Sequence, residues 1–138
     1  MKRTMFAVVF VCLCGSSVFA LTKDEEKSIL MSVVRQYELN EDEARILFAI
    51  RKHENGPVGL EFGVGQDEGQ GHPARRYSTD PRKSLRLQAE YAAGTIQKRF
   101  DGCLLSFAQR WCPKGPQQWH RSVHKILMTT YSEPPVDA

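Results

Sequence analysis

The carboxyl group of Glu54 has a position on its predicted helix that would suit acid catalysis. Glu54 follows Leu47 and Ile50 at the i, i+3, i+7 spacing of one helix face, which places it on an otherwise apolar stripe. Burial favours the protonated form of a carboxylic acid, which can then donate a proton to a leaving oxygen. Glu54 is therefore a candidate general acid, although a glutamate in the last turn of a helix more often points to solvent.

A glycine-rich segment follows this carboxyl group. Five glycines stand within thirteen residues, at positions 59, 63, 65, 69 and 71. Leu60, Phe62 and Val64 alternate with other residues at period two, which is typical of a short strand. We therefore expect a loop over 57–84, with or without a short β-hairpin, whose glycines turn tightly or approach another group closely.

Five helices are predicted to position this loop. The spacing of a capping box, Thr22 with Glu25 and Asn40 with Glu43, begins the first two helices. A proline after Asp80 begins the third. Apolar residues recur at helical period in all five segments, so the predicted fold class is mainly α. The expected helices cover about 22–37, 40–55, 80–100 and 104–111, with a fifth between the turn at 113–116 and residue 131.

The first twenty residues have the pattern of an export signal. Lys2 and Arg3 precede ten mostly apolar residues, and the small residues Val18 and Ala20 mark a cleavage site. Ten apolar residues are too few for a membrane span, which needs about 20. We expect a secreted or periplasmic protein without a stable membrane anchor. The predicted parts are a signal peptide at 1–20, one domain at 21–131 and a disordered tail at 132–138.

The charge balance argues against a nucleic-acid partner. The chain of 138 residues has 19 basic and 16 acidic side chains, a formal net charge of +3. Nucleic-acid binders concentrate basic residues on one face, whereas the basic runs here, Arg75-Arg76 and Arg82-Lys83, are short. We expect a monomer that binds no nucleic acid.

The residues from 51 to 66 resemble those of a known superfamily. A glutamate at the end of a helix, followed by a glycine-containing segment that ends in glutamine, is similar to the core of lytic transglycosylases and goose-type lysozymes. The Ala93-Gly94 step and the segment from Trp111 to Trp119 extend the resemblance over about 44–127. It implies a lysozyme-like α+β fold with Glu54 as the catalytic acid. It also implies a sugar groove, to which we assign Gly63, Val64, Gly65, Gln66 and Tyr91.

The resemblance implies a glycosidase that cleaves the glycan strands of peptidoglycan, in the first place a lytic transglycosylase. In that family a single glutamate protonates the oxygen between N-acetylmuramic acid and N-acetylglucosamine, and then accepts the proton of the muramoyl 6-hydroxyl. A hydrolase would need a second acid, for which Glu61, Asp67 and Glu68 are candidates. The alternatives are a lysozyme- or chitinase-type hydrolase and a catalytically inactive glycan-binding module on the same fold.

Several aromatic residues could support the catalytic acid. The family has a tyrosine that supports the acid, and Tyr77, Tyr91 and Trp111 are candidates for that role here. Trp111 and Trp119 continue apolar stripes, so we expect both in the core rather than as platforms for sugar rings.

Two further pairs of residues could form a disulfide bridge or bind a metal. A straight helix between Cys103 and Cys112 would separate their Cα atoms by roughly 13 Å, whereas a disulfide needs less than about 7 Å. A disulfide and two small buried thiols remain the alternatives. His120 and His124 are spaced i, i+4, which suits either two metal ligands or a solvated helix flank. We expect neither a metal nor a cofactor.

Overall fold

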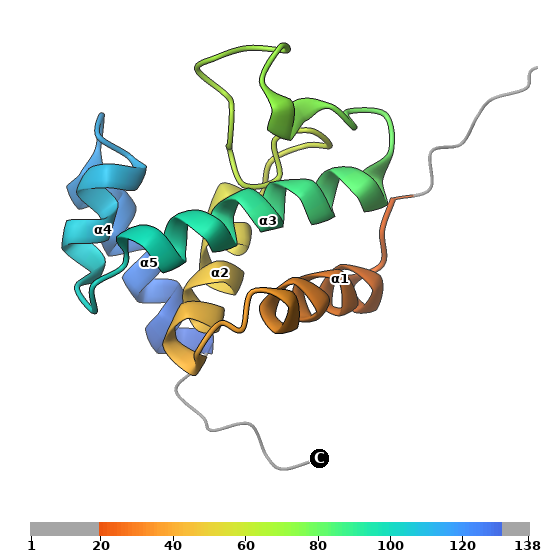
Figure 1. The fold of residues 1–138 in the computed structure, drawn as a ribbon. Coiled ribbons are helices and arrows are strands. Elements are labelled where there is room, and N and C mark those ends of the chain that lie inside the picture. Colours follow the sequence, from red (N-terminus) through yellow and green to blue (C-terminus); the bar gives the residue numbers. More distant parts are fainter. Residues whose placement is uncertain (1–19, 131–138) are drawn as a thin grey trace, which may run out of the picture.

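The computed structural model describes residues 20–130. The predicted signal peptide, apart from Ala20, and the predicted tail lie outside the described residues. Five α-helices and one short 3-10 helix form the described part (Figure 1), which confirms the mainly helical fold class. The elements are α1 (Lys23–Gln36), α2 (Glu41–Glu54), η1 (Pro73–Arg75), α3 (Pro81–Arg99), α4 (Leu104–Trp111) and α5 (Pro116–Thr130).

Local sequence rules explain where the helices begin and end. The Thr22 and Asn40 side chains each accept a hydrogen bond from the backbone of the residue three positions on, and the glutamates there close both capping boxes. Asp80 caps α3 in front of Pro81. Asn55 adopts the left-handed conformation with φ of 42°, which ends α2 directly after Glu54.

The core lies around the three central helices, α2, α3 and α5, of which α2 packs against both α3 and α5. Helix α1 runs beside α3, while α4 and α5 form a pair at one end of the molecule (Figure 1). Small residues in the middle of α3 are fully buried, as their sizes predict for close helix packing. The buried apolar side chains of the three central helices are Ile46, Leu47, Ala49, Ile50, Leu85, Ala89, Ala92, Ala93, Ile96, Trp119 and Val123.

The predicted short strand at 60–64 is not formed. Residues 57–80 make successive turns instead, with backbone hydrogen bonds from Leu60 to Pro57 and from Gly63 to Leu60. Gly63 and Gly65 have φ values of 69° and 79°, and this left-handed backbone interrupts the extended conformation that a strand requires. The described residues thus contain a glycine-rich loop over α3, without a β-hairpin (Figure 1).

No helix in the range 20–130 is long and apolar enough to cross a membrane.

Candidate active site

Glu54 is held in place by two tryptophans from the helix pair at the end of the molecule. It is the last residue of α2 and is half-buried. Its Oε1 accepts hydrogen bonds from Nε1 of Trp119 at 3.0 Å and from Nε1 of Trp111 at 3.3 Å. An indole N–H can only donate, so both indoles keep this oxygen fixed as an acceptor. The tryptophans therefore fix Oε1 of the carboxyl group, and they do not bind Oε2.

The second oxygen of Glu54 faces the glycine-rich loop. A Cβ atom added to Gly63 would lie 3.3 Å from Glu54 Oε2 and 3.8 Å from Gln66 Oε1. Gly63 also has a positive φ of 69°, so a side chain here would be strained and would crowd the carboxyl group. Of the residues predicted for the sugar groove, Gly63 and the exposed Gln66 are thus brought to Glu54.

Val64 and Gly65 contact the protein interior. Val64 is half-buried and packs against the core. Gly65 is buried, and a Cβ atom there would lie 2.7 Å from the imidazole ring of His72. The close approach that this glycine permits is therefore to His72.

Tyr91 packs against His72, the residue that Gly65 approaches closely. Its ring packs edge-to-face on His72 with 5.6 Å between ring centroids, and it lines a hollow of about 370 Å³ with Tyr37 and Lys98. Tyr77 lies instead near the cationic groups of Arg76 and Lys83. Of the three aromatic candidates for supporting the acid, only Trp111 hydrogen-bonds Glu54.

The tryptophans have a second role besides the core positions that the sequence predicted for them. Trp119 is 3% exposed, in agreement with the predicted core position. Trp111 is half-buried and stacks on Phe107 with 5.6 Å between ring centroids. Each packs its ring in the core and directs its N–H to Glu54. The same packing that buries the indoles therefore positions the carboxyl group.

Gln88 organises the loop, although it is not among the site residues predicted from the sequence. It is fully buried on α3. Its Oε1 accepts hydrogen bonds from the backbone N–H groups of Phe62 and Val64, both at 3.2 Å. Its Nε2 donates to the carbonyl oxygens of Gly59, Val64 and Ala74 at 3.0–3.1 Å. The sequence did contain a signal of its burial, because Gln88 comes three residues after Leu85 and four before Ala92 on the apolar face of α3.

Glu61 is turned into the protein. It is 4% exposed, and its Oε2 accepts hydrogen bonds from the Gly59 backbone at 3.1 Å and from Ser84 Oγ at 3.0 Å. The hypothesis that Glu61 positions a water molecule for hydrolysis is therefore wrong, because its carboxyl group is enclosed by α3 and the loop. Asp67 and Glu68 are exposed. Oδ1 of Asp67 lies 3.5 Å from Nζ of Lys114, in the turn between α4 and α5.

Burial raises the pKa of Glu61, against the opposing effects of its hydrogen bonds and of Arg51. A raised pKa in the folded state means that the neutral acid stabilises the fold at low pH. That contribution is lost as the pH rises from the usual value of 4.5 through the raised pKa. The Glu61→Gln variant lacks this titration, so we expect its free energy of unfolding to rise relative to wild type across this window. Urea titrations at a series of pH values measure the difference, and a flat difference would contradict the assignment.

The cysteine and histidine pairs lie on and around α4 and α5. Cys103 is an exposed free thiol and Cys112 a half-buried one, so neither the disulfide nor the pair of buried thiols is found. The reason is α4, which runs straight between them. His120 and His124 have near-parallel rings with centroids 5.8 Å apart. Within residues 20–130, no group of three or more His, Cys, Asp or Glu side chains is placed to hold a metal ion.

Comparisons of the chain with protein-family models, with curated proteins and with solved structures give no match. The proposed function therefore depends on the contacts around Glu54 and on the resemblance of residues 51–66 to lytic transglycosylases and goose-type lysozymes.

Proposed function

We propose that this protein is a secreted or periplasmic glycosidase of lysozyme-like fold that cleaves peptidoglycan, with Glu54 as its single acid and base. The observation that carries the proposal is the asymmetric environment of the Glu54 carboxyl group. Two indole N–H donors bind Oε1, while Oε2 lies beside Gly63 and Gln66 of the loop. Because Oε1 already accepts two hydrogen bonds, the proton of the neutral acid belongs on Oε2. Proton transfer is then directed toward the loop.

The one-carboxylate mechanism is supported by the burial of Glu61. In this mechanism the proton on Glu54 Oε2 moves to the oxygen that links N-acetylmuramic acid to N-acetylglucosamine, and the bond from C1 of the muramoyl ring to that oxygen breaks. The muramoyl 6-hydroxyl oxygen then bonds to C1, while Glu54 accepts the hydroxyl proton. The products are a 1,6-anhydro end and a free 4-hydroxyl group. The reaction consumes no water and restores the neutral acid.

The loop supplies the contacts to the glycan in this proposal. Gln66 is exposed and lies close to the carboxyl group, so its amide suits the N-acetyl and hydroxyl groups of a sugar. The backbone at Gly63 allows the glycan to approach closely because this residue has no side chain. Tyr91 binds another part of the strand in the hollow that it lines with Tyr37 and Lys98. The protein acts on glycan strands as a monomer, with no cofactor.

Digestion of purified sacculi tests the proposal directly. We expect soluble muropeptides with 1,6-anhydro ends, which differ from hydrolysed products by the mass of one water molecule. Products with reducing ends would instead indicate a lysozyme-type hydrolase, with Asp67 or Glu68 as the second acid. Cleavage of chitin oligomers but not of sacculi would indicate a chitinase-type enzyme. Binding to insoluble peptidoglycan without release of fragments would indicate the inactive module.

A further inference from the structure

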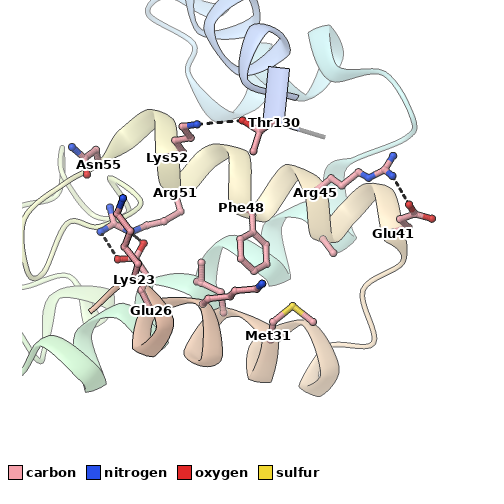
Figure 2. A pocket seen from close by; sticks show the side chains of 13 residues that line it. Lys23, Glu26, Met31, Glu41, Arg45, Phe48, Arg51, Lys52, Asn55 and Thr130 are labelled. Carbon is pink, nitrogen blue, oxygen red and sulfur yellow. Dashed lines mark hydrogen bonds and ion pairs between the residues drawn. The ribbon is translucent and has the colours of Figure 1, made fainter. Parts of the chain in front are cut away.

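A large hollow lies between α1 and α2, and the proposed reaction does not use it. Its volume is about 1000 Å³, and its wall also includes Thr130 at the end of α5. Phe48 extends from α2 toward α1, and Met31 lies on the opposite wall (Figure 2). Phe48 is half-buried and Met31 is 36% exposed. We call this hollow the α1–α2 groove, and its apolar residues are Leu30, Met31, Ala44 and Phe48.

The rim of the α1–α2 groove has an excess of positive charge. Its two acidic residues are each paired within the groove, Glu26 with Arg51 and Glu41 with Arg45 (Figure 2). The lysines of the rim, Lys23, Lys27 and Lys52, form no ion pair with a residue of the range 20–130. An occupant of this groove should therefore combine apolar side chains with carboxylates.

The described part of the chain ends at the α1–α2 groove. Thr130 lines it, and Oγ1 of Thr130 accepts a hydrogen bond of 3.2 Å from Nζ of Lys52 (Figure 2). The residues that follow are Tyr-Ser-Glu-Pro-Pro-Val-Asp-Ala, at 131–138. Eight extended residues reach at most about 28 Å, whereas a helix of the length of α1 spans about 21 Å. This segment is long enough to follow the groove.

We infer that residues 131–138 occupy the α1–α2 groove. Tyr131 and Val136 match the apolar wall, while the carboxylates of Glu133 and Asp137 match the lysines of the rim. The two consecutive prolines restrict the backbone beforehand, which reduces the entropy lost on docking. Composition alone predicts disorder for residues 132–138, but composition does not show a complementary surface formed by α1 and α2. The docked segment would hold the end of α5 against both helices.

Nuclear Overhauser effects in the intact protein test the inference. We expect cross-peaks between the Val136 methyl groups or the Tyr131 ring and the ring of Phe48. The double variant Glu133→Lys and Asp137→Lys should weaken these cross-peaks, whereas Ser132→Lys, which alters no carboxylate, should retain them. Random-coil shifts for residues 131–138 without such cross-peaks would overturn the inference.

Carbodiimide cross-linking identifies the occupant independently. Linkage of Glu133 or Asp137 to Lys23, Lys27 or Lys52 within one molecule is the expected result. A mixture of ¹⁴N- and ¹⁵N-labelled protein separates linkage within a molecule from linkage between molecules. Linkage between molecules alone would overturn the inference in favour of a second copy. Neither readout depends on whether Glu54 cleaves a glycan.

Discussion

Replacing Glu54 with glutamine is expected to abolish the release of muropeptides from sacculi while leaving the fold intact. The glutamine Oε1 can still accept hydrogen bonds from Trp111 and Trp119, so the packing around it is retained. An amide, however, has no acidic proton to give to the glycosidic oxygen. General acid catalysis contributes roughly 10²- to 10⁴-fold to a rate, so we expect the rate to fall at least about 100-fold. Mass spectrometry of soluble products measures the rate, and thermal unfolding reports on the fold.

Glu41→Gln is the matched control for this variant. Glu41 is exposed at the opposite end of α2, where it pairs with Arg45, and its substitution should leave the rate of cleavage unchanged. Activity of Glu54→Gln within a few-fold of wild type would remove the catalytic assignment. If Asp67→Asn or Glu68→Gln also abolished activity, the reaction would need two acids and the hydrolase alternative would be favoured.

Replacing Gln88 with leucine is expected to have the largest effect on stability. Leucine is close to glutamine in size, but it can neither accept from Phe62 and Val64 nor donate to the carbonyl oxygens of the loop. A buried polar group left without a partner costs about 1–3 kcal/mol. Because several groups lose their partner together, we expect the free energy of unfolding to fall by more than about 3 kcal/mol. Urea unfolding measures this change.

Loss of the Gln88 contacts should also reduce glycan cleavage, because the loop that carries Gly63 and Gln66 is then no longer held against α3. Gln97→Leu is the control on the same helix. Gln97 is exposed and donates to the backbone carbonyl of Tyr37 at the surface, and surface substitutions of this kind change stability by about 0.5 kcal/mol or less. A loss of stability in Gln88→Leu no greater than that in Gln97→Leu would show that water replaces the lost hydrogen bonds.

The sequence predicted the helices because the signals that define them are local. A capping box joins residues three positions apart, and an apolar stripe repeats within one or two turns. Thr22, Asn40 and Asp80 therefore marked the beginnings of α1, α2 and α3 correctly. The short strand was predicted wrongly, because period-two alternation takes no account of the left-handed backbone at Gly63 and Gly65.

The sequence by itself also placed Glu54 on an apolar helix face beside a glycine-rich segment. Only the tertiary structure decided what surrounds that carboxyl group. Its hydrogen-bond donors, Trp111 and Trp119, lie 57 and 65 residues further along the chain. Gln88 and Ser84 of α3 likewise determine the shape of the loop and the direction of Glu61. Such contacts depend on how whole helices pack against one another, and no spacing within a single segment contains that information.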